Sequence, residues 1–113
     1  LALEDEAVLL FGLRGHLFRS DDAGESWSQV DTGTLAMLTD GLWLDDGRIV
    51  ITGLGGTLLV SEDDGRSFDL LQLVDRRGIQ TAVQADPDSL LLVGEFGVKT
   101  MRVDDLSGSK EGE

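Results

Sequence analysis

Residues 49–68, IVITGLGGTLLVSEDDGRSF, repeat the pattern of residues 8–27, VLLFGLRGHLFRSDDAGESW, at a spacing of 41 positions. Each stretch begins with an apolar run, turns at Gly-x-x-Gly, continues with a second apolar run and ends in Ser-x-Asp-x-Gly-x-Ser followed by an aromatic residue. The first apolar run and the two glycines return once more in residues 90–97. So many identities at one spacing indicate a repeat protein.

The repeat divides residues 1–113 into two full units, 1–41 and 42–82, and a partial unit, 83–113. In the second unit we expect strands at about 41–44, 48–52, 57–60 and 68–73, joined by glycine-containing turns. The second strand of each unit is apolar at consecutive positions, which predicts that both of its faces are covered. Face-to-face stacking of four-stranded blades provides such cover.

The Ser-x-Asp segments resemble the BNR or Asp-box repeat, which occurs in sialidases, other glycosidases and many non-enzymatic propellers. The match is complete twice, in Ser20, Asp22, Gly24, Ser26 and Trp27, and again in Ser61, Asp63, Gly65, Ser67 and Phe68. With the preceding Gly-x-x-Gly, the pattern is most similar to propellers of the photosystem II stability and assembly factor family. This resemblance implies a sialidase-like β-propeller.

We therefore expect an all-β chain, a β-propeller fragment of about three four-stranded blades. The alternative is a β-trefoil, which closes with three units. It ranks second because the third unit has no Ser-x-Asp segment, and Leu106 stands where glycine is needed. The polar, glycine-containing tail, residues 105–113, is expected to fray instead of forming a strand.

The chain is strongly acidic, with 22 Asp and Glu against 9 Lys and Arg and a formal net charge of −13. Such a surface repels phosphate backbones, so a nucleic-acid partner is not expected. No apolar stretch approaches the roughly 18 residues of a membrane span, so direct membrane insertion is not expected either. The family resemblance alone implies an extracytoplasmic location, in a periplasm or lumen.

The Asp-box residues are expected to be folding elements. Asp22 and Asp63 can accept hydrogen bonds from nearby backbone N–H groups, as in Asx turns. Trp27 and Phe68 are expected to be large buried rings that hold each loop on its blade. The spacing of a calcium loop and its terminal glutamate are missing, so we expect no metal, and nothing else in the sequence calls for a cofactor.

The sequence predicts no enzyme. The resemblance to sialidases implies a tyrosine nucleophile, and the chain has no tyrosine. It also has no cysteine, and we interpret its one histidine, His16, as an ordinary strand residue. The alternative is a fragment of a sialidase-like or other glycoside hydrolase propeller whose catalytic residues lie outside this chain.

We expect a protein partner to bind at the end of the blades that carries the Gly-x-x-Gly turns. The candidate residues there are Arg14, Arg76, Arg77, Glu95 and Phe96. In so acidic a chain, adjacent arginines are potential anchors for a carboxylate, although an ordinary solvated loop explains them too. Phe96 either contacts a partner or caps the core.

Three blades span part of a ring, because propellers typically close with about four to eight. We expect the end blades to expose apolar faces built from Leu9, Leu17, Leu91 and Met101. Such faces favour self-association that completes a ring, unless the chain is cut from a longer propeller and stays with the remaining blades.

Overall fold

The computed structural model describes the backbone of residues 1–110 and the side chains up to residue 106. This part of the chain folds into three antiparallel sheets. The first contains β1 (Val8–Phe11), β2 (Leu17–Ser20) and β3 (Ser28–Gln29). The second contains β4 (Leu38–Trp43), β5 (Ile49–Gly53), β6 (Thr57–Ser61) and β7 (Asp69–Gln72). The third contains β8 (Ile79–Asp86), β9 (Ser89–Gly94) and β10 (Gly97–Arg102).

Three short 3-10 helices, η1 (Leu13–Gly15), η2 (Leu54–Gly56) and η3 (Val103–Lys110), complete the described chain. None of the described helices is long and apolar enough to cross a membrane. The fold is therefore all-β, with helical turns confined to connections.

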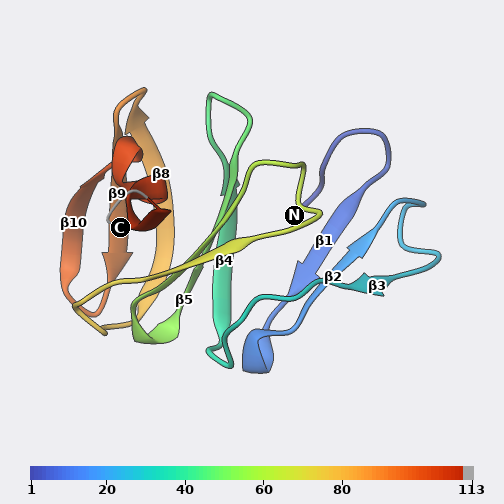
Figure 1. Ribbon diagram of the computed structural model, residues 1–113, viewed down its shortest axis with the longest axis horizontal. Helices are drawn as coiled ribbons and strands as arrows, with labels where there is room; N and C mark the ends of the chain where they lie inside the picture. The colour runs from blue at the N-terminus through green and yellow to red at the C-terminus, as the bar shows by residue number, and fades with distance from the viewer. Residues whose placement is uncertain (111–113) are drawn as a thin grey trace.

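The three sheets stand side by side with the four-stranded sheet in the middle (Figure 1). The first strands of the second and third sheets, β4 and β8, are neighbours. Thr39 Oγ1 donates a hydrogen bond to the carbonyl oxygen of Ile79 at 2.7 Å, and the Thr81 hydroxyl donates to the carboxylate of Asp40. Small antiparallel sheets stacked in this way are the blades of a β-propeller, so the chain is a propeller fragment and not a β-trefoil.

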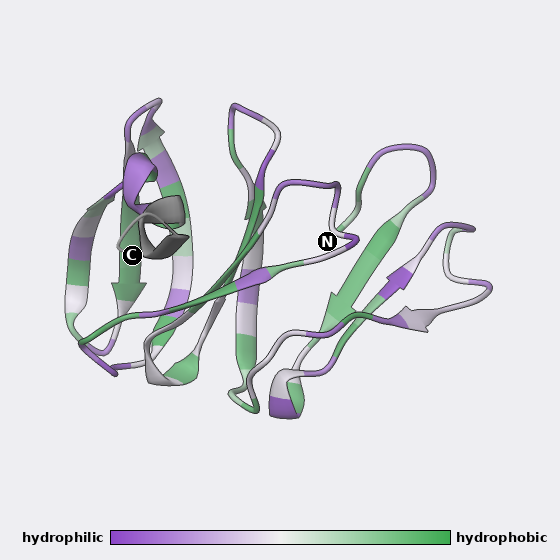
Figure 2. Ribbon diagram, in the orientation of Figure 1, coloured by the Kyte–Doolittle hydropathy of each residue, from purple (hydrophilic) through white to green (hydrophobic). Residues whose placement is uncertain are grey.

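Both faces of the middle blade are buried. Every residue of β5 and β6 lies in the interior, as the continuous apolar runs predict. The apolar strands of Figure 2 line two cores, one on each side of this blade. The first core, between blades one and two, contains Leu9, Leu17, Leu38, Ile49, Ile51 and Leu59. The second, between blades two and three, contains Leu44, Val50, Leu58, Val60, Ile79, Ala82, Leu90, Leu92, Val103 and Leu106.

The outward faces of the end blades differ from those predicted. Leu9 and Leu17 are fully buried against blade two, and Met101 packs against the second core. The open face of blade one instead carries Leu10, which is 56% exposed, and that of blade three carries Val83 and Val98. Half-buried Leu91 pairs with Val83 on this face. Successive residues of a strand point to opposite faces of its sheet. The sequence shows that both faces of an end blade carry apolar residues, but it does not show which of the two faces packs against blade two.

The strands of the second unit agree with the sequence prediction except at the first strand. β4 begins at Leu38, three residues before the expected start at 41, and it runs to Trp43. The repeat boundaries after residues 41 and 82 therefore fall inside β4 and β8. A sequence repeat has no natural starting point, and the hydrogen-bonded sheet decides where a blade begins.

The third unit departs from the repeat at its glycine turn. In blade two, Gly53 pairs with Thr57 across three residues, whereas in blade three Gly94 pairs with Gly97 across two. β10 is consequently shifted by one position relative to the 41-residue repeat, and Gly97 lies inside a strand. Gly56 and Gly97 align in the repeat, but they occupy different positions in their blades.

The tail forms no strand up to residue 110, as expected. Residues 103–110 form η3. Leu106 is buried in the second core, which gives a physical role to the leucine that replaces the repeat glycine. The last three residues of the predicted disordered tail, 111–113, lie outside the described residues.

Candidate functional site

The connections gather at two opposite ends of the blades. The Ser-x-Asp loops, residues 20–27 and 61–68, lie at one end (Figure 1). The other end, here called the glycine-turn face, consists of the turns 12–16, 53–57 and 94–97 with the inter-blade loops 30–37 and 73–78. Loop 73–78 lies against the turn of blade two, since a Cβ on Gly56 would stand 2.5 Å from the carbonyl oxygen of Asp75.

The first Ser-x-Asp loop is closed by its aspartate. Asp22 Oδ1 accepts hydrogen bonds from the Ser26 N–H at 2.8 Å and from the Ser20 hydroxyl at 2.7 Å, and Oδ2 accepts from the Ser26 hydroxyl at 2.6 Å. The Ser20 hydroxyl in turn accepts from the Gly24 N–H. The bonds from Ser26 and then Ser20 lower the pKa of Asp22 from 3.8 to about 2.

The second loop repeats the same contacts. Asp63 Oδ1 accepts from the Ser67 N–H at 2.9 Å and from the Ser61 hydroxyl at 2.8 Å, and Ser61 accepts from the Gly65 N–H. Partial burial opposes a lower pKa here, but the bonds from Ser67 and Ser61 outweigh it, so the pKa of Asp63 lies below its ordinary value. Both carboxylates are engaged within their own loops.

The aromatic residues of the two loops are not equivalent. Phe68 is half-buried and packs against the first core, whereas Trp27 is 41% exposed. The Trp27 indole N–H donates to the Gly24 carbonyl oxygen at 3.0 Å, so the ring lies over its own loop. The prediction of a buried Trp27 is therefore wrong, because its loop belongs to an end blade with no described neighbour on its outer side.

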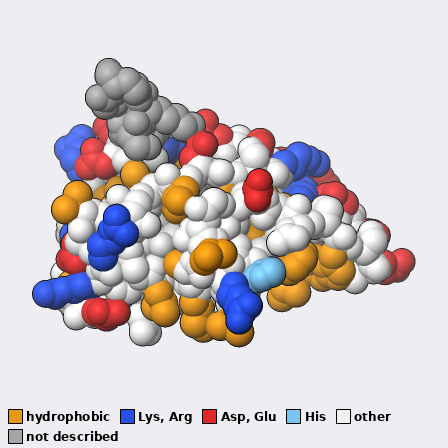
Figure 3. Space-filling view, turned by 60° about the horizontal axis from the view of Figure 1, so that its bottom comes forward, with side chains coloured by type: hydrophobic (Ala, Val, Ile, Leu, Met, Phe, Trp, Pro, Cys, Tyr) orange, Lys and Arg blue, Asp and Glu red, His pale blue; other side chains and the backbone are white. Residues whose placement is uncertain are grey.

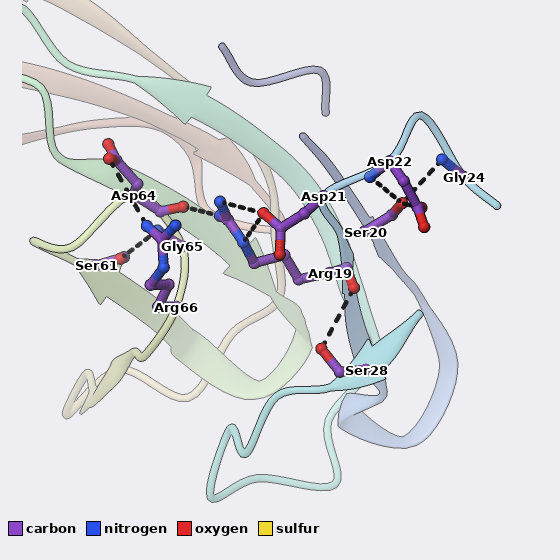
Figure 4. A network of polar contacts seen from close by, with 10 residues as sticks. All are labelled: Arg19, Ser20, Asp21, Asp22, Gly24, Ser28, Ser61, Asp64, Gly65 and Arg66. Atoms are coloured by element: carbon purple, nitrogen blue, oxygen red, sulfur yellow. Dashed lines mark hydrogen bonds and ion pairs between the residues drawn. The ribbon is translucent and has the colours of Figure 1, made fainter. Parts of the chain in front are cut away.

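Arg19 connects the two loops, and the sequence reasoning missed it. Its guanidinium donates to Asp21 Oδ1 at 3.0 and 3.2 Å and to the carbonyl oxygen of Asp64 in the next blade (Figure 4). The side chain is only 7% exposed. A signal was present: the equivalent position in the second unit is Val60, so a charge occupies an apolar strand position.

The described residues contain no group of three or more His, Cys, Asp or Glu side chains placed to hold a metal ion. The oxygens of Asp22 and Asp63 that face their loops already accept hydrogen bonds. The chemistry of this end is hydrogen bonding within the chain.

At the glycine-turn face, Glu95 and Phe96 have structural contacts. Glu95 Oε2 accepts a hydrogen bond from the Gly78 N–H at 3.0 Å. Phe96 is half-buried, packs against the second core and lies 5.2 Å below the ammonium group of Lys99. These contacts support one of the two interpretations of Phe96, that it caps the core. The other interpretation, contact with a partner, applies only to the part of the ring that is exposed.

The paired arginines lie beside them. Arg77 Nε is 3.8 Å and Lys99 Nζ 3.7 Å from the carboxylate of Asp75, so Asp75 holds these two cations together. Arg76 is exposed, and its backbone lies over the Gly56 turn. The arginines of loop 73–78 and Lys99 of β10 therefore lie at one corner of this face.

Arg14 belongs to a different part of the face. It lies in η1 with a positive φ of 58° and lines an open hollow of about 380 Å³ together with His16, Asp31 and Leu35. His16 is exposed and stacks on Phe18. No hydrogen bond or ion pair among the described residues joins Arg14 to the Arg76–Arg77 loop.

Exposed apolar side chains accompany these cations. The inter-blade loops contribute Leu35, 84% exposed, and Val74, 100% exposed, and the glycine turns contribute Leu13 and Leu54. Figure 3 shows hydrophobic side chains on this side of the molecule beside Lys, Arg and the single histidine. Leu35 and Val74 were missed because an isolated apolar residue in a loop carries no periodic signal.

Among solved structures, the chain is similar to one described as "YCF48 bound to D1 peptide", with 17% sequence identity and a TM-score of 0.46. The match covers 82% of this chain and 45% of that chain, so this chain spans less than half of its length. No protein-family model and no curated protein matches the sequence significantly.

The folding role of the Ser-x-Asp loops is tested by three substitutions. Phe68→Ala should lower the free energy of unfolding by about 3 kcal/mol, because it removes a ring from the first core, and Trp27→Ala by about 1 kcal/mol. Asp63→Ala should cost about 1 kcal/mol through the lost bond to the Ser67 N–H. Urea unfolding followed by circular dichroism measures all three.

The control is Glu62→Ala, which removes an exposed carboxylate from the same loop and should change stability by less than about 0.5 kcal/mol.

The lowered pKa of Asp63 adds stability that is fully present at pH values above 3.8, the ordinary pKa of an aspartate. This contribution is lost as the pH falls through the lower pKa of the folded state. The deficit of Asp63→Ala should therefore shrink at the most acidic pH. Equal stability of all variants would refute the folding role.

Proposed function

We propose that this chain is a non-catalytic β-propeller scaffold that binds a protein partner through its glycine-turn face. The observation that carries the proposal is the joint exposure of apolar and cationic side chains there. Leu13, Leu35, Leu54 and Val74 come from four separate connections; Arg14 lies in the connection of Leu13, and Arg76 in that of Val74. Exposed apolar groups next to arginine are typical of protein-binding surfaces.

The charge of the chain indicates the chemistry of the partner. The formal net charge is −13, with only 9 Lys and Arg against 22 Asp and Glu, and two of these cations, Arg77 and Lys99, lie next to Asp75. Arginine presents a planar fork that matches a carboxylate. We infer that the partner segment combines apolar residues with a carboxylate. The repeat pattern supports the narrower proposal that the chain acts like the photosystem II stability and assembly factor propellers.

Panning a phage-displayed peptide library against the purified chain tests this surface. Enriched peptides should carry apolar residues and Asp, Glu or a free carboxyl terminus. A double variant, Arg76→Ser with Leu35→Ser, should weaken their binding at least tenfold, because both side chains are exposed and removable without loss of core packing. Fluorescence anisotropy of a labelled enriched peptide measures the change.

The control for charge is Arg66→Ser, which removes an exposed arginine from the opposite end of the blades. It should bind the enriched peptides as tightly as the unmodified chain. If the glycine-turn variant also binds unchanged, the enriched peptides use another surface and the proposal is wrong.

We propose further that the chain has no glycosidase activity, on the ground that no tyrosine is present to serve as the sialidase nucleophile. Incubation of the purified chain with a fluorogenic sialoside should release no more fluorophore than buffer does. Turnover that a single substitution within the chain abolishes would favour the glycoside hydrolase alternative.

We also propose that residues 1–113 on their own self-associate through the open faces of the end blades. Leu10 and its cross-strand partner Phe18 lie on one face, and Val83 and Val98 on the other. Two copies supply six blades, within the range in which propellers close. In a longer propeller, neighbouring blades would cover the same faces.

Light scattering on the purified chain should give about twice its mass of 12.1 kDa, since each open face meets its complement in the second copy. Leu10→Lys places a charge on the open face of blade one and should shift the chain to the monomer. A folded, monodisperse species at 12.1 kDa for the unmodified chain would contradict self-association.

A further inference from the structure

The two inter-blade loops, residues 30–37 and 73–78, cross the glycine-turn face in the same way. In the first loop the Thr34 carbonyl group lies against the second glycine of the preceding turn, since a Cβ on Gly15 would overlap its oxygen. In the second loop the Asp75 carbonyl group lies against Gly56 in the same manner. Thr34 and Asp75 stand 41 positions apart, so the crossing is a feature of the repeat.

The side chain of the crossing residue also holds the backbone that follows it. Thr34 Oγ1 accepts a hydrogen bond from the Ala36 N–H at 3.1 Å. Asp75 Oδ1 accepts one from the Arg77 N–H, also at 3.1 Å. Threonine and aspartate side chains both form turns of this kind with the N–H two residues on. The two loops therefore have equivalent backbones although their side chains differ.

Each loop then attaches to the turn of the next blade. At the end of the first loop, the Leu54 N–H donates a hydrogen bond to the Met37 carbonyl oxygen at 2.9 Å. At the end of the second loop, the Glu95 N–H donates to the Gly78 carbonyl oxygen at 3.0 Å. The two donors stand 41 positions apart, and so do the two acceptors. The residues between the crossing and this bond are therefore attached to a blade on either side.

One exposed side chain occupies the same repeat position in both loops. Leu35, 84% exposed, directly follows the first crossing residue, and Arg76, also exposed, stands 41 positions later and follows the second. Arg77 lies next to the carboxylate of Asp75, whereas no acidic side chain of the described chain pairs with Arg76. Each loop has a described blade on both sides, in contrast to the open faces of the end blades. Leu35 and Arg76 are thus equivalent exposed positions of different chemistry.

We propose that this repeat position determines which partner segment the glycine-turn face binds. Leu35 contacts an apolar side chain, and Arg76 a carboxylate, of one extended segment that crosses both loops. The inference rests on the proposed function and adds an order to it, because the order of the two loops fixes the order of the two partner residues. Stacked sheets lie about 10 Å apart and an extended chain advances about 3.3 Å per residue, so these residues should stand about three positions apart.

Exchanging the two side chains tests the order. The double variant Leu35→Arg with Arg76→Leu keeps the composition and net charge of the chain, and both positions are exposed and have negative φ. Panned against a phage-displayed library of random peptides, the unmodified chain should enrich one order of the apolar and the acidic residue, and the variant the reverse order. In fluorescence anisotropy titrations, each labelled consensus peptide should bind the protein that selected it at least tenfold more tightly than the other protein. Circular dichroism establishes that the variant is folded.

A charge reversal tests the second position alone. Arg76→Glu should replace Asp or Glu by Lys or Arg in the enriched peptides and leave their apolar residue in place. The matched control is Arg66→Glu, which makes the same change of net charge at an exposed arginine of a Ser-x-Asp loop and should leave the preference for Asp or Glu intact. A shift of preference in both variants would overturn the proposal, because net charge and not Arg76 would then select the peptides.

The panning also separates this inference from the proposed function. If the unmodified chain enriches no peptide, both are wrong. If it enriches peptides whose binding depends on Leu35 and Arg76 but the exchanged variant selects the same order, the glycine-turn face binds peptides and the proposed role of this repeat position is wrong. Enrichment of both orders by the unmodified chain has the same consequence.

Discussion

The packing of each blade face against its neighbour is the interaction on which the rest of the structure depends. A blade of three or four short strands cannot bury a core by itself, and the middle blade does so only because blades one and three cover its two faces. This explains why β5 and β6 are buried at every position, while the strands of the end blades alternate between buried and exposed residues.

Within this arrangement the Ser-x-Asp loops form hydrogen bonds that stabilise the chain locally. Each Ser-x-Asp loop satisfies its own N–H groups through one aspartate and one serine. Arg19 adds a connection between blades, since its guanidinium bonds the backbone of the loop that follows β6. The close approach also depends on Gly65, where a Cβ would stand 3.2 Å from Leu9 of blade one. The end of the blades that carries the Ser-x-Asp loops is therefore occupied by contacts within and between blades.

The opposite end, the glycine-turn face, is the surface that we propose for contacts with a partner. The glycine-turn face carries exposed Leu35 and Val74 beside cations, in a chain whose charge is otherwise acidic. The hollow beside β10 has a mixed lining, since Leu71, Leu92 and Met101 lie next to the charged residues Asp75, Lys99, Arg102 and Asp105.

The sequence by itself determined the repeat, the strands and turns of each unit, and the aspartate-closed loops. These features depend on contacts within a few residues, such as the bond between Asp63 and Ser67, or on a pattern that recurs every 41 positions. Only the tertiary structure decided which faces of the end blades are covered, where β10 lies in register, and that Leu106 enters the core. It also brought Arg19 to Asp64, 45 residues away. Contacts over such separations depend on how whole sheets stack, and alternation along one strand cannot say which of its two faces will meet a neighbour.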